Sequence, residues 1–155
     1  MAELRRIVVG VDGSDNAGRA LDWAITLGRP QDAEIVAVHA VGLLAHLDSG
    51  PAVPAQSHLD ELHLVFETRW CAPLANCGLA HRMRCVDGTP VVALLETAER
   101  EDADMVVVGR RGAGGFPALL LGSTSHQLAQ HCTRPLLIVP SAPLRKVAPP
   151  EFRPR

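Results

Sequence analysis

The stretch Met105-Val106-Val107-Val108-Gly109-Arg110-Arg111-Gly112, followed nine residues later by Gly122-Ser123-Thr124, is the part of this 155-residue chain that decides its fold. It is an apolar run, then a glycine-bearing loop, then hydroxyl residues that open a helix. Glycine lets a backbone approach a phosphate closely, and a helix N-terminus offers unpaired N–H groups at the positive end of its dipole. The stretch therefore predicts a buried strand, a turn and an anion site in that order.

Its spacing differs from the common phosphate motifs. A P-loop needs a lysine directly after its last glycine, and the chain's only lysine is Lys146, near its C-terminus. A dinucleotide fingerprint needs G-x-G-x-x-G after the first strand, but the first apolar run leads into Gly10-Val11-Asp12-Gly13-Ser14. The sequence therefore argues against a P-loop and against NAD or FAD.

Charge and composition exclude further classes. The net charge is −2, and residues 141–155 carry four basic residues against one acidic residue, which leaves about −5 on 1–140. An acidic body with three Phe, two Trp and no Tyr argues against nucleic-acid binding. No apolar run approaches a membrane span and nothing resembles a signal peptide, so we expect a cytoplasmic protein with no membrane partner.

The rest of the chain shows little further chemistry. The four cysteines form no C-x-x-C pair and are expected to be reduced. His58 and His63 stand five residues apart, which separates them around a helix, so no metal site is predicted. We find no nucleophile–base pair, and no catalytic residue is predicted.

Apolar periodicity alternates between strand and helix through residues 1–140. Strand character is found over 5–11, 34–41, 81–86, 104–109 and 136–139. Helical spacing is found over 15–27, over 57–76, after Thr89-Pro90, and over 123–132. This alternation predicts right-handed βαβ units and one α/β domain with a parallel sheet. The Pro-rich segment 141–155 is predicted to be a flexible tail.

The strand composition predicts positions in the sheet. Residues 5–11 and 104–109 are the purest apolar runs, so we expect them at the centre, covered on both faces. Residues 81–86 are polar and suit an edge. Residues 136–139 are apolar, and an apolar edge invites pairing with a second chain, which suggests a dimer.

Ligands of open α/β sheets bind outside the carboxyl ends of the strands. If the strands 5–11 and 104–109 are neighbours, Asp12 and Gly109 lie at one crevice. Asp12 can then hold a ribose hydroxyl, a base amine or a metal-bound water, or it can be a turn residue. Ser123 and Thr124 can contact phosphates, or be plain N-caps of the helix that follows.

These residues resemble the universal stress protein family, in its small single-domain form. The resemblance is carried by Ile7-Val8-Val9-Gly10-Val11-Asp12-Gly13-Ser14, Val38-His39-Ala40-Val41, Gly88-Thr89-Pro90, Gly109-x2-Gly112-x9-Gly122-Ser123 and Arg134-Pro135-Leu136-Leu137-Ile138-Val139-Pro140. The G-x2-G-x9-G-[ST] spacing is typical of the ATP-binding branch. The resemblance implies an open, Rossmann-like five-stranded parallel sheet in order 3-2-1-4-5, with helices on both faces, and homodimers formed through Leu136–Val139.

The resemblance also implies roles in ATP binding. Asp12 and the backbone of Val41 hold the nucleoside end, and Gly109 lines the ribose region. The phosphates are held by Gly112, Gly122, Ser123 and Thr124. Arg110 and Arg111 depart from the family pattern, and either add phosphate contacts or point to solvent. Pro117 is expected to stiffen the loop between the glycines.

The function implied is an ATP-binding regulatory protein of the stress response. It would bind ATP with Mg²⁺ as a dimer, hydrolyse it slowly or not at all, and change its binding to an unidentified protein partner. Two alternatives stay open. One is a slow ATPase or nucleotidyl-transfer enzyme that uses Asp12 to position Mg²⁺. The other is a dimeric scaffold that binds no nucleotide or another adenine nucleotide, such as cyclic AMP.

Overall fold

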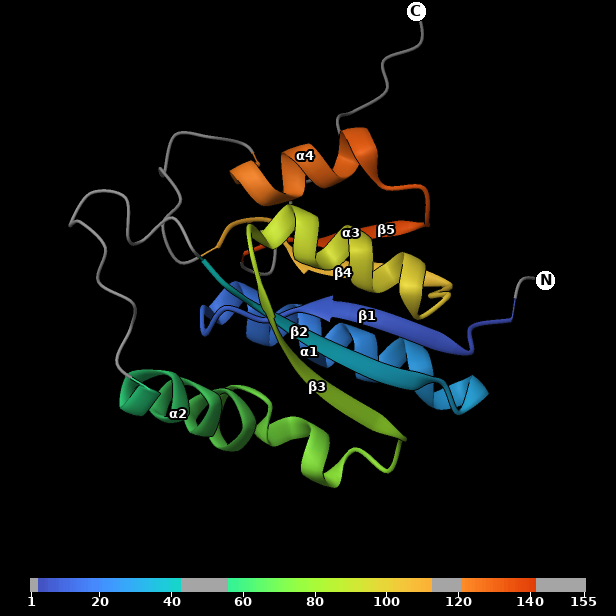
Figure 1. The fold of residues 1–155 in the computed structure, drawn as a ribbon. Coiled ribbons are helices and arrows are strands. Elements are labelled where there is room, and N and C mark those ends of the chain that lie inside the picture. Colours follow the sequence, from blue (N-terminus) through green and yellow to red (C-terminus); the bar gives the residue numbers. More distant parts are fainter. Residues whose placement is uncertain (1–2, 43–55, 113–120, 142–155) are drawn as a thin grey trace, which may run out of the picture.

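The computed structural model describes residues 3–42, 56–112 and 121–141 (Figure 1). Five strands form a parallel sheet in the order β3-β2-β1-β4-β5, which confirms the predicted fold class and strand order. The strands are β1 (Arg6–Gly10), β2 (Glu34–Val41), β3 (His81–Asp87), β4 (Met105–Gly109) and β5 (Leu136–Val139). The predicted tail after residue 141 and the predicted effect of Pro117 lie outside the described residues.

Helices cover both faces of the sheet (Figure 1). One face carries α1 (Asp15–Gly28), and α2 (Gln56–Val65) lies on the same side, beside β3. The opposite face carries α3 (Pro90–Arg100) and α4 (Ser123–His131). Each face has its own apolar core, because successive strand residues point to opposite sides: Ile7 and Val9 pack with α1, whereas Val8 packs with α3 and α4.

The predicted positions of the strands are confirmed. Ile7, Val8 and Val9 of β1 and Val106 to Val108 of β4 are buried, and both strands have a neighbour on each side. β2 is also an inner strand, which its composition had not singled out. β3 and β5 are the two edges. At the β5 edge, Leu136, Leu137 and Ile138 are only partly buried.

The start of α3 follows the sequence signal closely. Thr89 is the N-cap, its hydroxyl accepts a hydrogen bond from the N–H of Val92 (3.4 Å), and Pro90 occupies the first turn. The N-cap of α1 is Ser14, whose hydroxyl accepts from the N–H of Ala17 (3.2 Å). Both helices therefore begin directly after a strand, at the edge of the sheet where the strands end.

The single helix predicted over 57–76 is wrong in its continuity. The chain forms α2, then a π-helical turn, η3 (Phe66–Trp70), and then a 3₁₀ turn, η4 (Ala72–Asn76). Pro73 lies in the first turn of η4, where the missing N–H and the fixed φ of proline break an α-helical ladder. A π-helical turn and a 3₁₀ turn thus replace the last turns of the predicted helix, and Pro73 accounts for the second of them.

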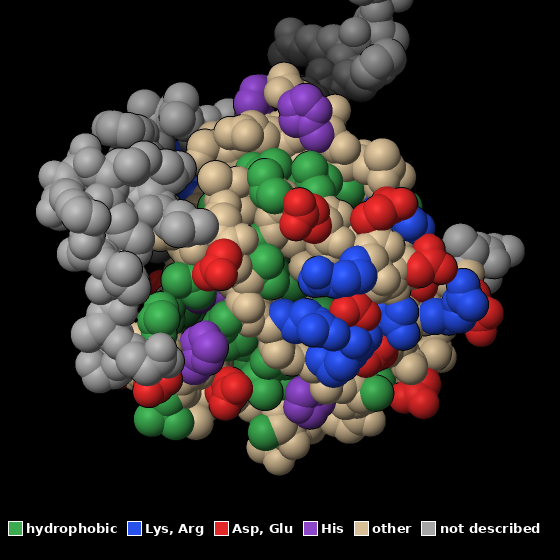
Figure 2. All heavy atoms as spheres, viewed as in Figure 1, with side chains coloured by type: hydrophobic (Ala, Val, Ile, Leu, Met, Phe, Trp, Pro, Cys, Tyr) green, Lys and Arg blue, Asp and Glu red, His purple; other side chains and the backbone are tan. Residues whose placement is uncertain are grey.

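Arginine and glutamate side chains gather over the β3 side of the sheet (Figure 2). Arg82 donates to Glu34 (Nε–Oε1, 2.6 Å) and to Glu101 (Nη2–Oε2, 2.6 Å). Arg84 pairs with Glu101 at 2.9 Å, and Arg6 pairs with Glu34 at 2.7 Å. The polar character of β3 is thus explained by a network of ion pairs that joins the edge strand to its neighbours.

This network changes the acidity of both carboxyl groups. The hydrogen bond from Arg82 is the largest influence on Glu34 and, with Arg6, outweighs burial, so the pKa of Glu34 lies below its ordinary value of 4.5. Burial is the largest influence on Glu101 and acts to raise its pKa, but the hydrogen bond and charge of Arg82, with the charges of Arg84 and Arg6, bring the pKa below 4.5. Both groups therefore favour the folded state when they are ionised.

We expect the free energy of unfolding to decrease as the pH falls. Because both folded-state pKa values lie below 4.5, the two carboxylates stabilise the fold fully above that pH, and their contribution is lost as the pH falls below it. Glu101→Gln should lower the free energy of unfolding by about 1 kcal/mol at pH 7. It should also make that free energy depend less steeply on pH in the acid range. Urea unfolding between pH 7 and pH 3 measures both effects. The matched control is Glu99→Gln, at an exposed position of α3; equal behaviour of the two variants would contradict the assignment.

Candidate functional site

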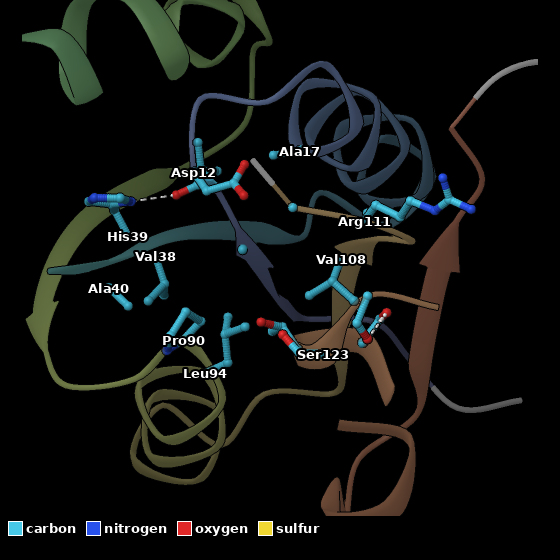
Figure 3. Close-up of a pocket in the computed structure, with 17 residues that line it drawn as sticks. Asp12, Ala17, Val38, His39, Ala40, Pro90, Leu94, Val108, Arg111 and Ser123 are labelled. Carbon is cyan, nitrogen blue, oxygen red and sulfur yellow. Dashed lines mark hydrogen bonds between the residues drawn. The ribbon is translucent and has the colours of Figure 1, made fainter. Parts of the chain in front are cut away.

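A cavity of about 350 Å³ opens where β1, β2 and β4 end, between the first turns of α1, α3 and α4 (Figure 3). This is the expected place for a ligand in a parallel α/β sheet. The volume lies within the range of small-molecule sites, roughly 300–1,000 Å³. The cavity lies at the place predicted for the ligand crevice, and its volume suits a small molecule.

Most of the predicted site residues lie on its wall. The structure brings together the aspartate after β1 and the glycine and hydroxyl residues of the second motif. Those that line the cavity are Asp12, Gly109, Arg111, Gly112, Gly122, Ser123 and Thr124. Arg110 and Val41 are not among the lining residues.

The contribution of β2 differs from the predicted one. The carbonyl of Val41, whose backbone the resemblance assigned to the nucleoside end, accepts a hydrogen bond from the N–H of Gly88 (3.3 Å) on the β3 side. Val38, His39 and Ala40 line the cavity instead. The wall is thus formed one to three residues earlier in β2. Sequence reasoning missed Ala40, and its only signal was its position at the carboxyl end of a buried strand.

Close packing between loops explains why Gly109 and Gly112 are glycine, and Gly122 is less tightly enclosed. A Cβ at Gly109 would lie 2.8 Å from the carbonyl carbon and oxygen of Asn16, and a Cβ at Gly112 would lie 2.7 Å from Oδ2 of Asp12. A Cβ at Gly122 would lie 3.2 Å from the carbonyl oxygen of Arg110. The loops after β1 and β4 can therefore approach each other closely because Gly109 and Gly112 lack side chains, whereas a Cβ at Gly122 would need a shift of only a few tenths of an ångström.

Asp12 is a turn residue, as one reading of the sequence predicted, and it also lines the cavity. Its Oδ1 accepts hydrogen bonds from the N–H of Ser14 (3.0 Å) and from the hydroxyl of Ser14 (2.5 Å), which is an Asx-type turn before α1. Its Oδ2 faces Gly112 across the cavity wall. The turn thus fixes the carboxylate at the place where the two loops meet.

The start of α4 corrects one interpretation. Ser123 and Thr124 are not N-caps, because Gly122 is the N-cap and makes no side-chain capping bond. Ser123 and Thr124 are instead the first two helical residues, where N–H groups have no partner within the helix. The positive end of α4 therefore borders the cavity, beside the hydroxyls of Ser123 and Thr124.

The two arginines of the loop differ in their placement. The main chain of Arg110 holds the loop: its N–H donates to Val139 (2.8 Å), and its carbonyl accepts from the N–H of Gly122 (2.8 Å) and from the hydroxyl of Ser125 (2.8 Å). Arg111 lines the cavity, but in Figure 3 its guanidinium extends away from Ser123 and Leu94. The Arg111 guanidinium therefore does not point at the centre of the site.

His39 lines the cavity and was not among the predicted site residues. Its Nδ1 donates a hydrogen bond to the carbonyl oxygen of Val11 (2.8 Å). Its ring also contacts Phe66 and Trp70, with centroid separations of 5.8 Å and 5.1 Å. The imidazole thus links the end of β1 to the π-helical turn η3.

Within residues 3–42, 56–112 and 121–141, no group of three or more His, Cys, Asp or Glu side chains could hold a metal ion. No helix in the described part of the chain has the length and apolar character needed to cross a membrane.

Comparisons with known proteins agree with this architecture. The family model described as "Universal stress protein family" matches residues 3–140. Universal stress protein YxiE of Bacillus subtilis is 31% identical over 145 residues, which cover 86% of this chain and 97% of that protein.

Solved structures share the fold. The structure of hypothetical protein MJ0577 has a TM-score of 0.80 at 20% identity, covering 90% of this chain and 97% of the other. A universal stress protein in complex with cAMP has a TM-score of 0.70 at 27% identity, covering 91% of this chain and all of the other. Given the sheet order, the converging loops and these matches, the chain belongs to the universal stress protein family.

Proposed function

We propose that this chain is a regulatory protein that binds ATP with Mg²⁺ in the cavity and changes its affinity for a protein partner with nucleotide state. The observation that supports this most directly is the meeting of two loops and a helix N-terminus at one cavity. Gly112, Gly122 and Ser123 supply close backbone approach and N–H groups for phosphates. Asp12 stands between the two loops, where a ribose or a hydrated Mg²⁺ would reach it.

The opposite part of the cavity suits an adenine base. Val38, Ala40, Pro90 and Leu94 lie together there, at the ends of β2 and the start of α3 (Figure 3). Small-molecule sites combine such apolar walls with a few polar groups that fix orientation. We assign the base to this wall and the phosphates to the start of α4, so the nucleotide would lie across the ends of β1 and β4.

Slow hydrolysis follows from the residues around the cavity. Among the described lining residues, the one histidine, His39, donates its Nδ1–H to the carbonyl oxygen of Val11 and is held in that hydrogen bond. A positioned general base is what would activate a water. We therefore propose a binding protein, for which turnover far below the roughly 1–10³ per second of ordinary enzymes is expected.

Cyclic AMP is the second candidate ligand. A related structure at 27% identity is a complex with cAMP, and a helix N-terminus binds a compact phosphate as readily as a chain of phosphates. The two ligands differ in their need for Mg²⁺, which ATP carries and a cyclic phosphodiester does not.

The β5 edge supports a homodimer. Leu136, Leu137 and Ile138 are apolar and only partly buried, at the end of the sheet that no described strand covers. Pairing of two such edges would bury these side chains and satisfy the outward backbone groups. We propose this edge as the contact between two copies, in the cytoplasm.

Calorimetric titration of ATP, with and without Mg²⁺, and of cyclic AMP and GTP tests the proposal. We expect ATP to bind and Mg²⁺ to strengthen its binding. GTP should bind more weakly, because guanine brings a carbonyl oxygen, an N–H and an amine to the apolar wall, whereas adenine brings a single amine. Binding of cyclic AMP but not ATP would favour the second ligand. Binding of neither would contradict nucleotide binding, and a monomer by light scattering in the same samples would contradict the dimer.

A further inference from the structure

Trp70 lies against the loop that carries Asp12, although it is not a lining residue of the cavity. A Cβ at Gly13 would lie 2.5 Å from Cε2 and 2.6 Å from Cζ2 of Trp70, so the indole rests directly on the Gly13 backbone. Gly13 has φ +81°, a left-handed conformation that glycine adopts readily. The loop thus follows the surface of the indole.

The same indole also contacts His39, which is hydrogen-bonded to Val11 on the other side of Asp12. Trp70 contacts His39 edge to face, with ring centroids 5.1 Å apart at 70°. His39 in turn donates to the carbonyl oxygen of Val11 (2.8 Å). Phe66, fully buried, packs against both rings. Val11 and Gly13, the two neighbours of Asp12, are therefore both fixed from η3.

The position of Asp12 leaves little freedom for movement. Its Oδ1 is engaged by Ser14, and its Oδ2 lies where a Cβ of Gly112 would be 2.7 Å away. A shift of the Val11–Gly13 backbone would displace this carboxylate relative to Gly112 and so change both loops of the cavity. Sites of this kind depend on the residues behind them that lock the loop geometry.

We infer that Trp70 is a positioning residue of the nucleotide site, which acts through Gly13 and His39 to place the Asp12 carboxylate. Its effect on affinity rests on the proposed function, whereas its effect on the loop does not. The π-helical turn that presents Trp70 fits this role, because such turns are uncommon and frequently occur at functional sites.

The chain offers a matched pair of substitutions, since Trp23 and Trp70 are its only tryptophans. Trp70→Phe keeps an aromatic ring near His39 but lacks the indole atoms that rest on Gly13. Trp23→Phe makes the same change on the surface of α1, where Trp23 is 50% exposed. In nucleotide-free protein, amide hydrogen exchange of residues 11–18 should be faster in Trp70→Phe and unchanged in Trp23→Phe, with the exchange of β1 and β4 unchanged in both.

Nucleotide affinity supplies the second measurement. ATP binding should be roughly fivefold weaker in Trp70→Phe than in wild type and unchanged in Trp23→Phe. Unchanged loop exchange in Trp70→Phe would overturn the inference, and so would faster exchange with unchanged ATP affinity. If wild type binds no nucleotide, the proposed function fails, and loop exchange alone decides whether Trp70 holds the loop.

Coupling between the two contact residues provides an independent check. Gly13→Ala places a methyl group into the indole, so part of its effect on loop exchange depends on Trp70. That effect should be smaller in the Trp70→Phe background, because the smaller ring leaves room. If the effects of Gly13→Ala and Trp70→Phe on loop exchange are strictly additive, the contact between Gly13 and Trp70 is not what holds the loop.

Discussion

Replacement of Gly122 by Asp is expected to weaken ATP binding by about 100-fold. Gly122 is the N-cap of α4 and lines the cavity next to Ser123. A carboxylate there would face the phosphates at the helix N-terminus, and the juxtaposition of like charges costs several kcal/mol. The carboxylate would also accept the helix N–H groups that we assign to the phosphates.

The fold should tolerate this change. Gly122 has φ −68° and ψ 163°, an extended conformation open to any residue, and Asp and Asn are both favoured N-caps. The added Cβ would lie 3.2 Å from the carbonyl oxygen of Arg110 and from Cα of Arg111, so the loop must yield by a few tenths of an ångström. This steric effect has to be separated from the effect of charge.

Gly122→Asn separates them, because it has the same shape and no charge. We expect calorimetric ATP titration to give a large loss of affinity for Gly122→Asp and a much smaller one for Gly122→Asn, with similar thermal stability of both nucleotide-free proteins. Equal losses in the two variants would show that the crowded loop, rather than repulsion of phosphates, is responsible. Wild-type affinity in Gly122→Asp would place the nucleotide elsewhere.

The sheet could be predicted because its signals are local. Apolar runs such as Ile7 to Val9 and Val106 to Val108 alternate with helical spacing, and Thr89-Pro90 marks a helix start. The break after Val65 could not be predicted in the same way. It depends on where Phe66 and Trp70 pack against His39, a contact between residues far apart in the chain.

In the candidate site, too, local sequence signals predicted some features, and contacts between distant residues determine the others. The spacing of Gly109, Gly112 and Gly122 predicted a ligand loop, and these residues do line the cavity. Why each is glycine could not be predicted, because the neighbours that exclude a side chain, such as Asn16 and Asp12, come from the opposite end of the chain. The register of β2, which presents Ala40 rather than Val41, likewise depends on its pairing with β3.

Gly109→Ala should lower the free energy of unfolding by about 2 kcal/mol, even without nucleotide. The methyl group would lie 2.8 Å from main-chain atoms of Asn16, in the first turn of α1, and backbone cannot move aside as a flexible side chain can. Gly109 is not among the described glycines with positive φ, so the cost is steric and not conformational. β4 and α1 would have to separate.

Gly18→Ala, two residues along α1 from Asn16, should instead raise the free energy of unfolding. No heavy atom lies within 4 Å of a Cβ at Gly18, and alanine stabilises a helix interior by roughly 0.5–1 kcal/mol relative to glycine. Urea unfolding measures the free energy of unfolding of Gly109→Ala and Gly18→Ala. If both variants are stabilised, or both destabilised, the close packing of Gly109 against Asn16 is contradicted. If Gly109→Ala loses stability as expected, this glycine is required by the fold itself. Its presence in the motif is then evidence for close loops, and evidence for phosphate binding has to come from Gly122 and the start of α4.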